Sequence, residues 1–562
     1  MLRTTTMERS VSGVALDGLA PLEVGELLER KAKGNSLFRH TLGRAVLLSM
    51  IYLVAKELFP GPMEPGGSLW SLLLVWVCAY HVGHAFDAVG APKSLGFLVS
   101  GLVLQSLPHA PNLLHALQGL VPWWSKDIRA AAMALVLLRA GLGLDIKVVR
   151  SYGWALPALA TLPSLVESVV GAAFASYLFD MPYLLAWVMS FMVSAVGPAI
   201  VASGCTAVKE KGFNPKAPNL LMTASVFDDT TCIIGFNCLL HAWITGPGNV
   251  GWQYAIGPMN LVLGLFGGLC AALVMSFTSL YPGVGPRTWT LFWMGMMLIF
   301  VAEEHSLLGA GAIANLVFGL GVRHCWRKGW PRRLLMREHA ESAAYGTAVA
   351  DEYLKTSLAG LHQVWNIAFY PLLFGLIGAA LNPRSVKPAV GKLSLAYAAF
   401  TVAVRFFATA AVTTVVPALR DNFTRGERMF IACAWVSKAT TQAAFATVPL
   451  ITIQAWIAAH PTGTMWKGYT AAQLLLFGQE IQWCCVLSIF MGTPLGTIFM
   501  NNGARFLLDK ADSLPVTGTD GGLQQSTTFV KAEDMQAGAP LAVDGVGTAS
   551  GSSEKHLNGS KS

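Results

Sequence analysis

One apolar run constrains the fold of this chain more than any other stretch. Residues 217–243 are long enough to cross a membrane as a helix, and Asp228 and Asp229 lie side by side near the middle of the run. A bilayer core about 30 Å thick needs roughly 20 helical residues, so both carboxylates are expected near the midplane. A charge there costs at least ~2.5 kcal/mol on insertion scales. A salt-bridged structural pair is one interpretation; we favour a cation or proton site.

The rest of the chain has the composition of a membrane protein. Of its 562 residues, 54% are hydrophobic and 12% are charged, and the mean hydropathy is +0.52. Apolar runs separated by polar residues predict an all-α polytopic protein with about fourteen spanning helices. The predicted spans are residues 41–59, 69–86, 93–107, 128–144, 152–178, 183–208, 217–245, 252–281, 287–302, 306–322, 359–380, 389–417, 428–456 and 469–497.

The placement of the basic residues predicts the orientation. With the N-terminus in the cytoplasm, the cytoplasmic loops hold most of the Lys and Arg, whereas the opposite loops hold little beyond Lys126, Arg384, Lys387 and Lys467. This asymmetry follows the positive-inside rule and places both termini in the cytoplasm. It also accounts for the net charge of +8, so no nucleic-acid partner is expected. The expected location is the plasma membrane or an organellar membrane, in contact with its lipids.

Four segments follow from this pattern. Residues 1–40 are polar and contain no apolar core of a signal peptide, so we expect a cytoplasmic N-terminal segment. Residues 41–500 form the membrane domain, interrupted by a basic cytoplasmic loop at 323–358. Residues 514–562 are rich in Gly, Ser and Thr without periodicity, and are expected to form a disordered cytoplasmic tail. The nine cysteines lie mostly in apolar runs and form no CxxC pair, which predicts packing roles.

Three further ionisable residues lie inside predicted spans. Glu167 is in the fifth, Arg405 in the twelfth and Lys438 in the thirteenth. Buried charges in lipid are tolerated when they are paired or line a wet cavity. Adjacent helical positions point about 100° apart, so the two aspartates are expected to have different neighbours. The fifth and twelfth spans lie seven apart, as do the sixth and thirteenth, which indicates a duplicated unit.

The sixth span carries a proline at mid-membrane, Pro198, directly after Gly197. Proline removes a backbone donor and clashes with the preceding turn, so the helix must kink or open there. A lone proline often only kinks a helix. Beside a span with two aspartates, we expect an unwound crossing that offers backbone carbonyls and helix ends to an ion.

Six stretches form a specific combination. They are ALVLLRAGLGLD (134–145), VGPAIVASG (196–204), NLLMTASVFDDTTCIIGFN (219–237), PLLFGLIGA (371–379), the Arg405 span and WVSKATTQAA (435–444). Together they resemble the sodium/proton antiporters of the cation:proton antiporter-2 group, most closely the animal NHA type, over most of residues 90–500. The resemblance implies an NhaA-like fold with inverted repeats, two broken crossing helices in a six-helix core, a separate dimerisation domain and a homodimer.

The resemblance also implies roles for individual residues. Asp229 looks like the carboxylate that binds Na⁺ and H⁺ in turn, and Asp228 like its neighbour that faces a charge-compensating lysine, Lys438. Glu167 and Arg405 look like the buried ion pair between the two core repeats.

The chain departs from the family pattern at several positions. Ser437 stands where animal relatives tend to have proline before the lysine, which leaves the break in the thirteenth span open, and Ser203 replaces a second proline in the sixth. Gly197 stands where serine is usual. LIGAALN (376–382) lacks a glutamate often found there, so Glu167 is the expected acidic partner of Arg405.

A single carboxylate is enough to couple two ions. Burial disfavours the charged form of Asp229, so Na⁺ and H⁺ compete for its oxygens, and a site that crosses the membrane only when neutralised exchanges one for the other. Asp229, Asp228 and Thr440 are the expected ligands of Na⁺ or Li⁺, with no further cofactor. The resulting hypothesis is a secondary transporter working by alternating access, not an enzyme.

Three alternatives were weighed. A K⁺/H⁺ antiporter of the same fold stays open. A cation channel usually takes its acids as rings from several subunits, which fits a hinged helix and a buried lysine less well. An intramembrane aspartyl protease needs one aspartate on each of two facing helices, whereas here the two are consecutive and no GxGD-like second site occurs.

Overall fold

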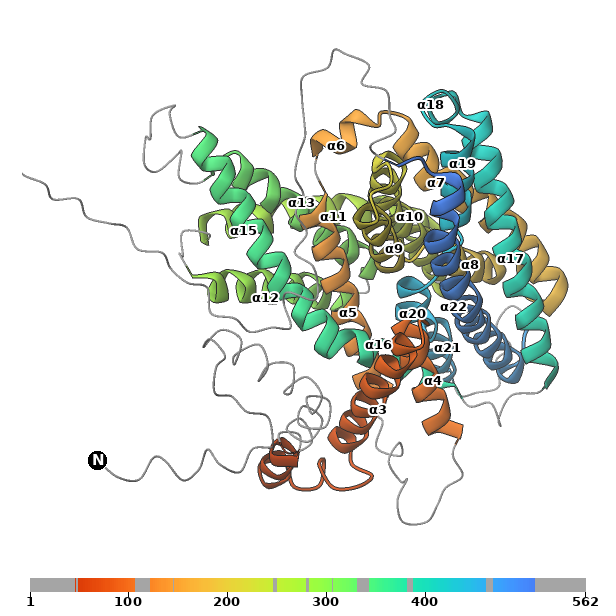
Figure 1. The fold of residues 1–562 in the computed structure, drawn as a ribbon. Helices are drawn as coiled ribbons and strands as arrows, with labels where there is room; N and C mark the ends of the chain where they lie inside the picture. Colours follow the sequence, from red (N-terminus) through yellow and green to blue (C-terminus); the bar gives the residue numbers. More distant parts are fainter. Residues whose placement is uncertain are drawn as a thin grey trace, which may run out of the picture. The chain divides into compact units, whose positions relative to one another are not determined.

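The computed structural model describes residues 46, 49–106, 122–144, 146–245, 250–278, 283–305, 307–330, 343–381, 388–460 and 468–510 (Figure 1). Nearly all of these residues are helical, so the all-α class is as predicted. The segments predicted at residues 1–40 and 514–562 lie outside the described residues.

Many of the helices have the length and surface of membrane spans. In the described part of the chain, ten helical stretches are long and apolar enough to cross a bilayer. Large apolar side chains point outward from them, including Phe266, Trp293 and Phe407, each more than 60% exposed. Such side chains are stable against lipid and costly against water. The chain is therefore an integral membrane protein, while the count of fourteen spans and the inverted repeat stay predictions.

The helices fall into two groups by packing. The core group comprises α7 (Ala155–Phe179), α8 (Tyr183–Ser194), α9 (Pro198–Glu210), α10 (Lys216–Thr245), α17 (Pro388–Val415), α19 (Arg425–Ala434), α20 (Thr440–Phe445), α21 (Val448–Ala459) and α22 (Ala471–Leu507). The flanking group comprises α3 (Ser68–Ala88), α4 (Lys93–Ser106), α5 (Pro122–Gly143), α11 (Val250–Thr278), α12 (Val284–Glu304), α13 (Leu308–Arg327), α15 (Ala343–Val364), the π-helix η5 (Trp365–Phe369) and α16 (Tyr370–Ala380). Short α6 (Ile146–Ser151) and α18 (Pro417–Arg420) join longer helices.

Each group has its own packing centre. In the core group, α17 packs against α7 and α22, and α8 packs against α7 and α10 (Figure 1). In the flanking group, α13 packs against α5, α11 and α12, and α16 packs against α3 and α4. Helices α4 and α16 touch backbone to backbone, because a Cβ on Gly101 would lie 2.0 Å from the Gly375 oxygen. Small residues allow this close approach inside a membrane, where apolar attraction between helices is weak.

The two groups meet at the middle of the molecule. Helix α10 packs against α11 and α13, and the short helix α20 packs against α5 and α16. Both α10 and α20 carry polar residues that the sequence marks as a site, so any site on them lies at the boundary between the groups.

The predicted cytoplasmic loop at 323–358 is wrong in its extent. Helix α13 continues to Arg327, and α15 begins at Ala343 and runs to Val364. The basic composition of the stretch favoured a loop, yet apolar residues on α15, such as Ala350, Leu354 and Leu361, are buried against neighbouring helices. This buried stripe stabilises a helix in spite of its charged outer face.

Candidate ion-binding site

Two interrupted helices cross beside the aspartates. Helix α8 ends at Ser194 and α9 begins at Pro198, so the sixth span is open immediately before the proline. The thirteenth span is open between Ala434 and Thr440, although Ser437 stands where a proline would mark a break. The backbone N–H of Gly197 donates to the Ser437 carbonyl at 2.9 Å, which joins the two openings directly. A Cβ at Gly197 would lie 2.9 Å from the Ala439 Cβ, so the absence of a side chain at Gly197 lets the two open segments approach this closely.

The opened segments are held by neighbouring side chains. Gln442 of α20 donates from Nε2 to three carbonyls at the end of α8, those of Met192 at 3.1 Å, Val193 at 3.1 Å and Ala195 at 2.7 Å. Carbonyls at a helix end have no partners within the helix, so this amide replaces missing hydrogen bonds. Gln442 belongs to the stretch WVSKATTQAA (435–444), and no contact was predicted for it from the sequence.

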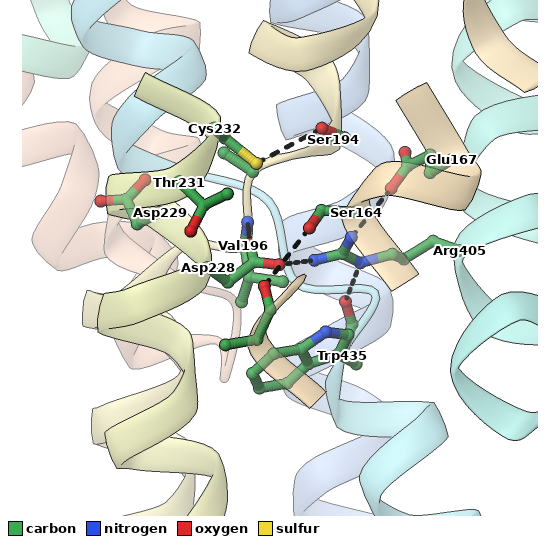
Figure 2. A network of polar contacts seen from close by, with 12 residues as sticks. Ser164, Glu167, Ser194, Val196, Asp228, Asp229, Thr231, Cys232, Arg405 and Trp435 are labelled. Carbon is green, nitrogen blue, oxygen red and sulfur yellow. Dashed lines mark hydrogen bonds and ion pairs between the residues drawn. The ribbon is translucent and has the colours of Figure 1, made fainter. Parts of the chain in front are cut away.

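Asp228 lies in a fully buried ion pair. Its Oδ1 accepts from Arg405 Nη2 at 2.7 Å, and its Oδ2 accepts from the backbone N–H of Val196 at 2.8 Å, in the open part of the sixth span (Figure 2). Arg405 Nε also points at the Trp435 carbonyl at 3.4 Å, in the open part of the thirteenth. The Asp228–Arg405 pair therefore links α10 and α17 to both interrupted helices, through Asp228 to the sixth span and through Arg405 to the thirteenth.

Glu167 lies between the two buried bases. Its Oε1 accepts from Lys438 Nζ at 2.6 Å, and its Oε2 lies 3.4 Å from Arg405 Nη1. Lys438 Nζ also donates to the Val193 carbonyl at 2.6 Å. The four charged side chains are each no more than 1% exposed. The expected ion pair of Glu167 with Arg405 is present as the longer of two contacts.

The expected pairing of Lys438 with Asp228 is wrong in this structure. Lys438 contacts Glu167, while Asp228 takes Arg405 as its partner. The reason is geometric: Lys438 sits in the open segment of the thirteenth span, where its amine reaches α7 and the end of α8 instead of α10.

Asp229 is separate from this network. Figure 2 shows its carboxylate directed away from Asp228 and Arg405. It is 2% exposed, and among the described residues the Thr441 hydroxyl, which donates to its Oδ1, is its hydrogen-bond partner. Among the described residues, no Lys, Arg or His lies within ion-pair distance of the Asp229 carboxylate.

Asp229 faces a small cavity of about 10 Å³, roughly the room that one water needs. Its walls come from both helix groups: α5 supplies Met133, Val136 and Leu137, α16 supplies Leu373, and α20 supplies Thr440, Thr441, Ala444 and Phe445. Thr440 Oγ1 is buried without a hydrogen-bond partner among the described residues. The cavity therefore offers carboxylate and hydroxyl oxygens, the hard ligands that small cations prefer.

The structure brings most of the expected site residues together in two places. Asp229 and Thr440 line the cavity, and Asp228, Glu167, Arg405 and Lys438 form the network beside it. Thr441, which the sequence had not put forward as a ligand, makes the hydrogen bond to Asp229.

A helical membrane protein in which two interrupted helices cross beside buried carboxylates is a secondary ion transporter by class. The family model described as the transmembrane domain of sodium/hydrogen exchangers matches residues 71–485, well over half of the chain. The chain belongs to this sodium/hydrogen exchanger family.

Individual relatives agree with this assignment. The chain is 25% identical over 493 residues to sodium/hydrogen exchanger 9B2 of Homo sapiens, covering 85% of this chain and 82% of the relative. It is 26% identical over 471 residues to sodium/hydrogen exchanger 9B1 of Homo sapiens, covering 81% of each. The solved structure of the sodium proton antiporter MjNhaP1 from Methanocaldococcus jannaschii matches with a TM-score of 0.54 at 15% identity. That match covers 78% of this chain and 98% of the archaeal chain, and supports the fold.

Proposed function

We propose that this chain exchanges Na⁺ for H⁺ across a membrane, with Asp229 binding the two ions in turn. The observation that supports the role of Asp229 is a balance of charge. Asp228 and Glu167 are matched by Arg405 and Lys438, so Asp229 is the carboxylate left without a basic partner in the network. An isolated buried carboxylate is stable when it holds a proton or a cation and unstable when it holds neither.

The position of Asp229 suits alternating access. The cavity has walls from the core group and from the flanking group, so a movement of one group past the other would change the path that leads to the carboxylate. Because the empty site carries a bare charge, such a movement is favourable only after an ion has bound. Exchange then follows without any coupling device beyond the carboxylate itself.

The ligand chemistry and the relatives together favour Na⁺ or Li⁺. The cavity offers carboxylate and hydroxyl oxygens with room for about one water-sized ion, which suits an alkali cation, and the relatives described above are sodium/hydrogen exchangers. For this reason we rank Na⁺ and Li⁺ above K⁺, and an antiporter above a channel, which needs a continuous open path. We expect Thr440 and Thr441 to complete the ligands of the ion, Asp228 to hold the helix beside the site, and no bound cofactor to be required.

The proposal also covers the orientation of the chain in its membrane and its assembly. The asymmetry of Lys and Arg between loops supports cytoplasmic termini in a plasma or organellar membrane. The resemblance to homodimeric antiporters supports assembly of two copies, with lipid around the remaining apolar faces.

The test is Asp229→Asn in purified protein reconstituted in liposomes. An amide cannot become neutral by taking up a proton and offers Na⁺ no full charge, so we expect cation-dependent proton movement to fall to the level of empty liposomes. Thermal melting in the same lipid should match or exceed the wild type, since a bare buried charge has been removed. Normal exchange by Asp229→Asn would overturn the assignment. Titration of Na⁺, Li⁺ and K⁺ on the wild type identifies the substrate.

A further inference from the structure

A second cavity, of about 260 Å³, lies next to the site, at one end of the boundary between the helix groups. It will be called the vestibule. Three of its walls continue those of the Asp229 cavity, about one turn away: Arg129 lies one turn before Met133 on α5, Leu376 lies one turn after Leu373 on α16, and Thr447 lies one turn after Ala444, beyond α20. One helical turn is about 5.4 Å, so an ion in the vestibule is close to Asp229.

The most unusual residue of the vestibule is Arg129. It is 3% exposed, and its guanidinium donates from Nη1 to the Ser125 hydroxyl at 3.0 Å. Its Nε is buried without a hydrogen-bond partner among the described residues, and no ion pair forms there. A guanidinium carries five N–H donors and always keeps its charge. The Thr447 hydroxyl, 5% exposed, also lines the vestibule and also has no partner among the described residues.

Neighbouring acids do not neutralise Arg129. Glu303 acts on it electrostatically from outside the vestibule, but its carboxylate pairs with Lys126 at 2.8 Å. Asp127 on α5 and Glu480 on α22 lie two positions from the lining residues Arg129 and Gln482, hence on other faces of their helices.

The chain segments that follow the vestibule helices add no acid either. Residues 107–121, 382–387 and 461–467 contain neither Asp nor Glu. The vestibule wall beside Arg129 is formed by Leu376, Ala379 and Ala380, which carry no charge. The vestibule therefore has one excess positive charge.

We propose that the vestibule binds one small monovalent anion, of chloride or acetate size, on Arg129 with help from the Thr447 hydroxyl. The guanidinium faces a cavity with polar walls from Gln105 and Gln482, so the anion exchanges a hydration shell for fixed donors. A monovalent anion makes the vestibule neutral. It also removes the repulsion that Arg129 exerts on a cation moving toward Asp229, so the anion speeds cation entry from this side.

Binding can be measured without transport. Purified wild-type protein is melted at constant Na⁺ and ionic strength while lactobionate, a sugar acid much larger than the proposed ligands, is replaced by chloride or by acetate. We expect a saturable rise in melting temperature of about 1–3 °C. Arg129→Gln should abolish it, and the control Lys392→Gln, which removes an exposed positive charge on α17 outside the vestibule, should retain it. No saturable rise in the wild type, or a full rise in Arg129→Gln, overturns the proposal.

The effect on transport rests on the proposed function and is measured separately. In liposomes, we expect the apparent KM for Na⁺ to be about 3- to 10-fold lower in chloride than in lactobionate, and Arg129→Gln to show one low KM in both. An equal KM in both anions for the wild type would refute the role in cation entry. Absence of all exchange together with anion-dependent melting would refute the antiport proposal alone.

Discussion

Asp228 and Asp229 are adjacent, equally buried and chemically identical, yet the protein surrounds them in opposite ways. Asp228 has a guanidinium at 2.7 Å and a backbone N–H at 2.8 Å. Asp229 has one threonine hydroxyl and a small cavity. The difference comes from a rotation of about 100° between successive helical positions, which turns one carboxylate into the core group and the other toward the boundary. The comparison teaches that pairing, and not burial, distinguishes these two carboxylates, and it is the ground on which we assign the transport role to Asp229.

The largest expected effect is on the structural side of the comparison. Glu167→Gln removes the acid that contacts both Lys438 and Arg405, so it leaves buried positive charge in excess. We expect a loss of about 3–5 kcal/mol in stability, measured by unfolding in defined lipid or detergent. Glu167→Gln with Lys438→Gln should recover part of the loss. Asp421→Asn, which removes an exposed acid paired with its neighbour Arg420, is the control and should change little.

Asp228→Asn tests the comparison directly. Arg405 loses its shorter ionic contact but keeps Glu167 and the Trp435 carbonyl, so we expect a smaller loss of about 1.5–3 kcal/mol. Exchange should continue, at a reduced rate, because Asp229 and its cavity are unchanged. This is the reverse of Asp229→Asn, which should abolish exchange and keep stability. If Asp228→Asn and Asp229→Asn behaved alike in melting and in exchange, the assignment of a structural role to Asp228 and a transport role to Asp229 would be wrong.

Lys438→Gln tests whether exchange depends on Asp229 alone or also on a buried base. Glu167 retains Arg405, so the protein should fold, and Asp229 is untouched, so cation-dependent proton movement should continue with a shifted pH profile. The measurement is exchange across a range of pH in liposomes, with melting in the same lipid. Complete loss of exchange in a well-folded Lys438→Gln protein would make the lysine an obligatory proton carrier, against the single-carboxylate mechanism.

The smallest expected effect concerns the hydrogen bond that Thr441 donates to Asp229. Thr441→Val keeps the shape of the side chain but removes the hydroxyl, and a neutral hydrogen bond contributes about 1 kcal/mol. We expect the apparent affinity for Na⁺ to fall about fivefold. Thr441→Ser, which keeps a hydroxyl, should resemble the wild type. An unchanged Na⁺ titration in Thr441→Val would remove Thr441 from the ion site.

The sequence predicted the elements of the site better than their contacts. Apolar run lengths, the proline in the sixth span and five charges within spans singled out residues that lie together in the structure, on α7, α10, α17 and the two interrupted helices, while their role as an ion site stays a prediction. The pairing failed because it assumed one partner for each charge. An arginine has five donors and can serve two acids at once, as Arg405 does with Asp228 and Glu167, which leaves Lys438 for the second oxygen of Glu167.

Thr441, which the sequence did not put forward, shows a second limit. Helix α20 starts at Thr440 after an open segment, so its rotation cannot be read from the spacing of apolar residues upstream. An amphipathic pattern carries phase only within one continuous helix. The break in the thirteenth span could not be predicted from the local sequence either, because no proline marks it at Ser437. Gly492 and Gly496 of α22 leave room for the interrupted backbone, and both are far from Ser437 in the chain.

The amide of Gln442 has a consequence for which substitutions the protein can accept. It donates hydrogen bonds to the main-chain carbonyls of Met192, Val193 and Ala195 at the end of α8, and any amino acid at these three positions would supply the same carbonyl. The identity of the side chains at the end of α8 is therefore free to drift, within the limits of volume, while the junction between the two interrupted helices stays intact. The chemical demand of this contact falls on Gln442, and a screen of all single substitutions should find Gln442 far less tolerant than the three residues whose carbonyls it binds.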